Sequence, residues 1–105
     1  MTPRWIVPIV AAPALAVSVS ARAATIVISM KNLEISPAEA SAKVGDTLEL
    51  VNKDVLVHTA TARNGDFDLT MPPNKTVTMV LKKAGKVEYY CRFHPNMKAT
   101  LDIAP

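Results

Sequence analysis

The sequence contains a single cysteine, Cys91, and only two histidines among its 105 residues. One cysteine excludes an internal disulfide. A domain of this size buries only about 60–65% of the surface of its extended chain, and such domains often depend on a disulfide or a metal. With the disulfide excluded, a metal is the stabilising element that the sequence leaves available. Two histidines are too few for a multinuclear metal centre, which argues against an oxidase.

No apolar run reaches the roughly 20 residues that a membrane-spanning helix needs. The longest run, Trp5–Val19, is interrupted by two prolines, begins after Arg4 and is followed by Ala21-Arg22-Ala23. A basic start, an apolar middle and a small-x-small exit are typical of a secretory signal peptide. We therefore expect residues 1–23 to be a signal peptide that is cleaved after Ala23. An uncleaved membrane anchor is the alternative interpretation.

The expected mature chain, residues 24–105, is a single domain exported to the periplasm, with no membrane span after cleavage. The whole chain carries a formal charge of +3, from 12 basic and 9 acidic residues. Removal of Arg4 and Arg22 with the signal leaves ten basic residues against nine acidic ones. This near balance excludes the concentrated basic surface that nucleic-acid binding requires.

No helical periodicity appears after residue 24, and the mature chain instead consists of short alternating segments separated by turn signals. The expected strands are Thr25–Met30, Ser41–Val51 with a hairpin at Gly45-Asp46, Val55–Thr61, Thr76–Leu81, Val87–Cys91 and Ala99–Ile103. Asn64-Gly65-Asp66 and Met71–Asn74 are expected loops, since a pair of prolines does not fit a central strand. The pattern predicts an all-β fold, an antiparallel Greek-key β-sandwich of seven to eight strands.

The residues with metal-binding chemistry are concentrated near the end of the chain. His94 and Met97 follow Cys91 at intervals of three, and Pro95 bends the chain between them. A tight loop of this spacing can place a thiolate, an imidazole and a thioether around one point, and His58 can add a second imidazole from a neighbouring strand end. Two imidazoles and a thiolate in a plane, with a long axial methionine, are the ligands of a blue copper site.

Simpler interpretations exist for each of these residues taken alone. A lone cysteine is often a small buried hydrophobe, Met97 could fill the core and His94 could lie at the surface. Those interpretations leave a free thiol unexplained in an oxidising compartment, whereas a metal-bound thiolate explains it. Zinc is disfavoured, because a thioether is a poor zinc ligand while methionine selects copper.

The chain resembles the cupredoxins, and its Cys-x-x-His-x-x-Met loop is most similar to that of the amicyanins. The resemblance extends over nearly the whole mature chain, through Ile35-Ser36-Pro37, Val44–Thr47, Val51–Asp54, His58-Thr59 and Gly85–Cys91. It implies one copper ion that cycles between Cu(I) and Cu(II), held by His58, Cys91, His94 and Met97. It also implies a monomeric carrier of single electrons, not an enzyme, that meets a redox donor and an acceptor in transient encounters.

Two positions in the ligand segments depart from the relatives. Thr59 replaces the asparagine whose side chain usually connects the two ligand segments, and a threonine can do so only over a shorter reach. Phe93 replaces a proline of the amicyanins and plastocyanins, and its backbone N–H could donate to the Cys91 sulfur. We expect the exposed edge of His94 to be the electron exit, within an apolar surface made of Leu56, Met71, Pro72, Pro73, Phe93 and Pro95. A basic rim could consist of Lys53, Arg63, Arg92 and Lys98.

A copper carrier or chaperone is the competing hypothesis. It would use the same four ligands but would exchange its ion readily and favour Cu(I). Such proteins more often carry Met- and His-rich surface sites, which this sequence lacks. A visible spectrum of the copper-loaded protein distinguishes the two hypotheses.

Overall fold

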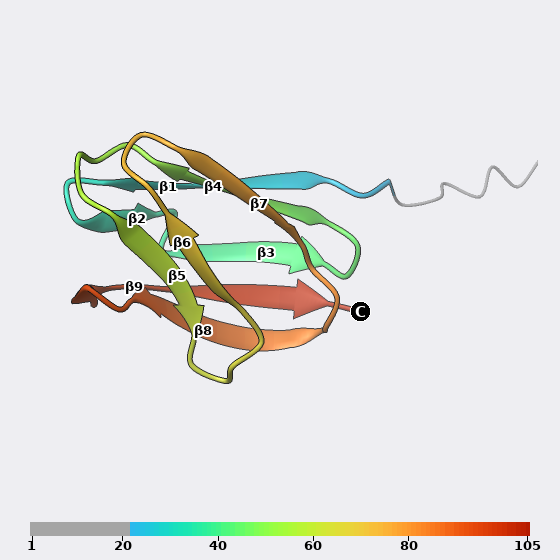
Figure 1. The fold of residues 1–105 in the computed structure, drawn as a ribbon. Helices are drawn as coiled ribbons and strands as arrows, with labels where there is room; N and C mark the ends of the chain where they lie inside the picture. The colour runs from blue at the N-terminus through green and yellow to red at the C-terminus, as the bar shows by residue number, and fades with distance from the viewer. Residues whose placement is uncertain (1–21) are drawn as a thin grey trace, which may run out of the picture.

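The computed structural model describes residues 22–105, which form a β-sandwich of nine strands (Figure 1). The strands are β1 (Thr25–Lys31), β2 (Glu34–Ser36), β3 (Glu39–Lys43), β4 (Thr47–Asn52), β5 (His58–Ala62), β6 (Asp68–Met71), β7 (Thr76–Val80), β8 (Gly85–Cys91) and β9 (His94–Ala104). The expected all-β sandwich is confirmed. The count exceeds the expected seven to eight because the short strands β2 and β6 lie in stretches without clear alternation. The expected signal peptide, residues 1–23, lies almost entirely outside the described residues.

The two layers are mixed sheets and not the antiparallel sheets that the sequence suggested. One sheet has the order β2-β1-β4-β7 and the other β3-β9-β8-β5-β6. The pairs β1–β4 and β3–β9 are parallel, and the remaining pairs are antiparallel. Parallel neighbours arise because the chain passes from one sheet to the other between consecutive strands.

The expected hairpin at Gly45 and Asp46 is wrong for the same reason. Strands β3 and β4 belong to different sheets, and residues 44–46 carry the chain across the sandwich. Gly45 has a φ of +95°, a conformation that favours glycine. A tight turn signal therefore marked a corner between sheets, because local sequence specifies the bend but not which strands pair after it.

The core lies between the sheets and follows the period of two that the sequence predicts. In β8 the side chains of Val87, Tyr89 and Cys91 are all buried, as expected from their shared face. Leu101 and Ile103 of β9 face the same core. The opposite sheet contributes the buried apolar side chains Ile28, Met30, Ile35, Leu48 and Leu50.

The connections gather at the two ends of the sandwich (Figure 1). Residues 32–33, 53–57, 72–75 and 92–93 lie at one end, and this end carries the candidate site. The corner 44–46 and the C-terminus lie at the other end. No helix in the described part of the chain is long and apolar enough to cross a membrane.

Candidate metal centre

Cys91 is the last residue of β8 and is completely buried. It pairs with His94, the first residue of β9, and Arg92 and Phe93 form the turn between them. A register shift at Tyr90 and Cys91 interrupts the ladder at this point. The segment expected to be a loop is thus a β-hairpin end, so the backbone pairing of two central strands fixes where the cysteine and the histidine lie.

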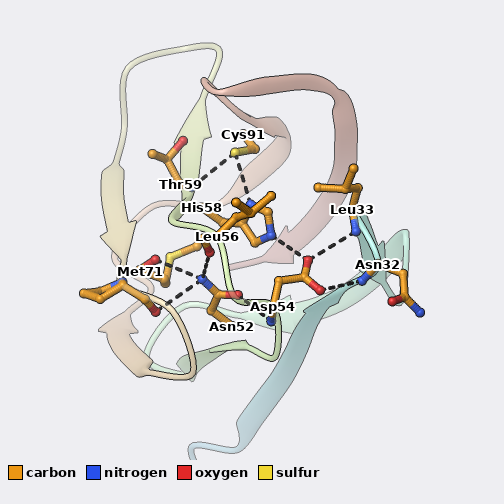
Figure 2. Close-up of polar contacts among 10 residues, drawn as sticks. Asn32, Leu33, Asn52, Asp54, Leu56, His58, Thr59, Met71 and Cys91 are labelled. Carbon is orange, nitrogen blue, oxygen red and sulfur yellow. Dashed lines mark hydrogen bonds and ion pairs between the residues drawn. The ribbon is translucent and has the colours of Figure 1, made fainter.

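The Cys91 sulfur faces the imidazole of His58 (Figure 2). Sγ and Nδ1 are 3.7 Å apart, and both side chains are fully buried. Metal–thiolate and metal–imidazole bonds of about 2.3 and about 2.0 Å, meeting at about 120°, would hold these two atoms about 3.7 Å apart. This pair of donor atoms therefore fits a trigonal metal site.

His58 is oriented by Asp54, which lies four residues earlier in the loop between β4 and β5. Nε2 of His58 lies 2.7 Å from Oδ2 of Asp54 (Figure 2). An ionised carboxylate only accepts hydrogen bonds, so Nε2 must carry the proton and donate it. The Nδ1 lone pair is then free and points toward the sulfur. A hydrogen-bonded carboxylate that fixes the tautomer and direction of a histidine is typical of metal sites.

Asp54 is itself held by the turn between β1 and β2. Its carboxylate accepts the backbone N–H groups of Asn32 at 2.7 Å and Leu33 at 3.2 Å. Burial, the largest single influence, raises the pKa of Asp54, but the hydrogen bonds from His58, Asn32 and Leu33 together bring it below the ordinary value. Asp54 therefore stays ionised near neutral pH. Sequence reasoning missed this role, although the i to i+4 spacing of Asp54 and His58 was a visible signal.

Asn52 is a second residue that sequence reasoning missed. Its side chain is 1% exposed, and Nδ2 donates to the carbonyl oxygens of Leu56, Met71 and Pro72 at 2.8, 3.0 and 3.2 Å. Its Oδ1 accepts the backbone N–H of Asp54 at 2.9 Å. One buried amide thus fixes the loop that carries Asp54 and joins it to the end of β6 (Figure 2).

Thr59 connects the two segments that carry the candidate ligands. Its hydroxyl oxygen accepts the backbone N–H of Arg92 at 2.8 Å, so the short reach of threonine is sufficient. The backbone N–H of Thr59 points to the Cys91 sulfur, with the nitrogen 3.4 Å from Sγ. The expectation that Phe93 supplies this N–H is wrong. Among residues 22–105 the backbone donor to Sγ is Thr59, while the N–H of Arg92, which follows the cysteine, donates to the Thr59 hydroxyl.

His94 lies beside this pair without completing a cluster around it. The His94 ring is half-buried and meets the His58 ring edge-on, with centroids 5.4 Å apart and planes at 75°. Met97 is 2% exposed, and a surface hollow is lined by Leu33 and residues 93–97. Across residues 22–105, no three His, Cys, Asp or Glu side chains form a metal-binding group as they stand. The structure brings His58 and Cys91 together and places His94 alongside.

The apolar surface around His94 differs from the expected one. Met71 is fully buried and belongs to the core, whereas Leu56 and Phe93 are about half exposed, as expected. Sequence reasoning missed three further exposed apolar side chains at this end, those of Leu33, Val55 and Val57. Val55 and Val57 were expected in a strand, Val55–Thr61, but β5 begins only at His58, so both lie in the loop before it.

The expected basic rim is partly neutralised. Arg63 lies 3.2 Å from Glu88, and Arg92 lies 3.3 Å from Asp68. The Arg63 guanidinium also sits 4.5 Å from the centre of the Tyr90 ring. Two of the four expected basic residues therefore have carboxylate partners.

The comparisons with known proteins agree with this architecture. A family model described as a cupredoxin-like domain matches residues 5–103. The methylamine utilization protein MauL of Methylorubrum extorquens is 32% identical over 81 residues, which cover 73% of this chain and 71% of that protein.

Solved structures of amicyanin share the fold. A reduced amicyanin mutant with a proline replaced by phenylalanine has 25% identity and a TM-score of 0.65, covering 75% of this chain and 81% of that one. An oxidised mutant with a methionine replaced by leucine has 23% identity and a TM-score of 0.67, covering 74% and 80%. The chain therefore belongs to the cupredoxin-like family, whose members are small blue copper proteins that carry electrons and are not enzymes.

Proposed function

We propose that this protein is a periplasmic carrier of single electrons that holds one copper ion with His58, Cys91, His94 and Met97. In this proposal residues 1–23 direct export and are cleaved off, and residues 24–105 are the working domain. The observation that carries the proposal is the 3.7 Å separation of His58 Nδ1 and Cys91 Sγ in a buried site. The family match and the similarity to MauL support copper as the metal.

Copper, when bound, would supply a centre that alternates between Cu(I) and Cu(II) and so accepts and releases one electron. The protein's own contribution is a rigid set of donors. Asp54 holds the imidazole of His58 in one tautomer, and the Thr59 N–H directs positive charge toward the sulfur. Such a hydrogen bond to a metal-bound thiolate favours the reduced state. Because strands β5, β8 and β9 fix these groups, little would rearrange when the electron arrives.

The proposed electron exit is the partly exposed His94, which stands among exposed apolar side chains. Val55 is 82% exposed, Phe93 55%, Leu56 47% and Leu33 46%. Small apolar surfaces suit short-lived redox encounters, which bury less area than stable complexes. We propose that the donor and the acceptor both approach this surface, and that the protein works as a monomer.

The visible spectrum of the purified, copper-loaded protein tests the proposal. A trigonal thiolate–copper site gives an intense blue band, and reduction with ascorbate should remove it reversibly. A colourless protein that loses its ion to a mild chelator would instead indicate the copper carrier or chaperone. Absence of stoichiometric copper binding would contradict both functions.

A further inference from the structure

The end of the sandwich far from the candidate metal centre contains a buried carboxylate that the proposed function does not use. Asp46 is 4% exposed and sits in the corner between β3 and β4. Its Oδ1 accepts the backbone N–H of Ala24 at 2.8 Å, and its Oδ2 accepts that of Lys43 at 2.9 Å. The hydrogen bond from Ala24 has the largest effect on the pKa of Asp46, which it lowers, and the hydrogen bond from Lys43 lowers it further. The side chain is therefore a buried anion whose partners are neutral amides.

One of those two partners is the residue that the proposed cleavage would turn into the N-terminus. Ala23 and Ala24 are exposed and precede the first strand, which begins at Thr25. Ala24 is nevertheless fixed at its carbonyl, which accepts the backbone N–H of Thr47 at 2.9 Å. The peptide bond between Ala23 and Ala24 is thus accessible. Its nitrogen, the backbone nitrogen of Ala24, already donates a hydrogen bond to the Asp46 carboxylate.

We propose that Asp46 is the binding site for the N-terminal ammonium group of the mature protein. A signal peptidase adds water across the Ala23–Ala24 peptide bond, so that Ala23 leaves with a carboxylate and Ala24 keeps an amino group. That amine takes up a proton at neutral pH, since its ordinary pKa is about 7.7–8.0. The hydrogen bond from a neutral amide then becomes an ion pair at the same nitrogen. This inference rests on the export and cleavage proposed above.

The pairing would stabilise more than one element. A charge-assisted hydrogen bond is stronger than a neutral one, and the attraction between opposite charges grows where the carboxylate is shielded from water. Backbone hydrogen bonds at the same corner connect strands of both sheets: the carbonyl oxygen of Asp46 accepts the N–H of Leu81 at 2.8 Å, and the N–H of Val44 donates to the carbonyl oxygen of Ala104 at 2.9 Å. An ion pair here would join the start of β1 to the corner whose backbone is bonded to the ends of β7 and β9.

A thermodynamic cycle on the full mature protein tests the inference. The chain that begins at Ala24 is compared with one that retains Ala23, which moves the amino group one residue away and restores the amide. Both chains are also made with the substitution Asp46→Asn. The matched control is Asp102→Asn in both chains, which removes an exposed carboxylate. We expect the Ala24 form to melt about 4–8 °C above the extended form at pH 6.5. Asp46→Asn should abolish this difference and Asp102→Asn should preserve it. Equal melting temperatures would overturn the inference.

A second measurement does not depend on whether Asp46→Asn folds. The rate at which an amine-selective acylating reagent modifies the α-amino group of the folded, copper-loaded protein is compared with the rate in a denaturant. We expect at least a tenfold protection in the folded protein. Unprotected reaction would refute the ion pair. The intact mass of the exported protein separates the two proposals, because a mass starting elsewhere refutes cleavage after Ala23 and leaves the blue spectrum as the test of function.

Discussion

The hydroxyl oxygen of Thr59 lies 2.8 Å from the backbone nitrogen of Arg92, 33 positions later in the chain. The backbone nitrogen of the same threonine lies 3.4 Å from the Cys91 sulfur. One residue of β5 therefore satisfies the turn between β8 and β9 and also supplies the N–H that points at the thiol. This side chain therefore adds a second connection, beyond the pairing of β5 with β8, between the two segments that carry the candidate ligands.

Removing the Thr59 hydroxyl should loosen the candidate site. Thr59→Val keeps the shape of the side chain but leaves the Arg92 N–H without its partner, which costs about 1–3 kcal/mol when the group is buried. Urea unfolding of the copper-loaded protein measures the loss. Thr59→Ser retains a hydroxyl and serves as the control, with an expected loss below about 1 kcal/mol. Equal losses in the two variants would assign the effect to packing.

The proposed ligands should differ in their effects. Cys91→Ser should remove the intense visible band, because the thiolate is the donor of the charge-transfer transition. Met97→Leu should keep a blue protein and change its reduction potential, because the axial bond is weak. Absorption spectra and voltammetry of the two variants check this. Loss of copper binding in Met97→Leu, together with a blue Cys91→Ser, would reverse the assigned roles.

Loss of the Asp54 charge should weaken metal binding although all four proposed ligands remain in place. In Asp54→Asn the His58 ring loses the ionised acceptor that selects its tautomer, and changes of this kind lower metal affinity about 10–100-fold. Competition with a chelator of known affinity measures the change. Asp102→Asn, an exposed substitution at the opposite end of β9, should leave the affinity unchanged.

Asp54 should also make the protein sensitive to acid. Its pKa is lowered in the folded state, so its stabilising contribution is present above the ordinary value of about 3.9 and disappears as pH falls through the lowered one. The metal-free protein should therefore lose stability steadily below about pH 4. Asp54→Asn should give a shallower dependence in urea titrations between pH 5 and 2. An identical slope would show that other carboxylates dominate.

Replacement of the buried Tyr89 by phenylalanine should not lower the stability of the folded protein. Tyr89 is fully buried, and within residues 22–105 its hydroxyl has no hydrogen-bond partner. Its ring packs on Phe67, with centroids 6.0 Å apart, and that contact survives in Tyr89→Phe. An unsatisfied buried polar group costs about 1–3 kcal/mol, so the variant should be at least as stable as the natural protein. A loss above about 1 kcal/mol would reveal a partner for the hydroxyl.

The same substitution should change the response to alkali. Burial raises the pKa of Tyr89 in the folded state, so the unfolded chain loses this proton first. Stability should then fall as pH rises above the ordinary tyrosine value of about 10. Tyr89→Phe removes this contribution, and thermal melts from pH 8 to 11 should show a smaller decline. Parallel declines in both proteins would contradict it.

The sequence by itself determined the all-β class and the faces of the main strands, and it indicated the chemistry of the candidate site. Alternation with a period of two placed Val87, Tyr89 and Cys91 on one buried face, because neighbouring side chains in a strand point to opposite sides. The spacing from Cys91 to Met97 indicated copper because a thiolate, an imidazole and a thioether have a joint preference for that metal. These features are local, so they can be read from consecutive residues.

Only the tertiary structure decided which distant segments meet. It placed β3 and β4 in different sheets, where the turn at Gly45 had suggested a hairpin. It brought Asp54 against the turn after β1 and set Ala24 on Asp46, 22 residues away. A bend in the chain fixes its local direction, but strand pairing depends on how the whole set of apolar faces is buried at once. The contacts that orient His58 and that hold Ala24 follow from that arrangement.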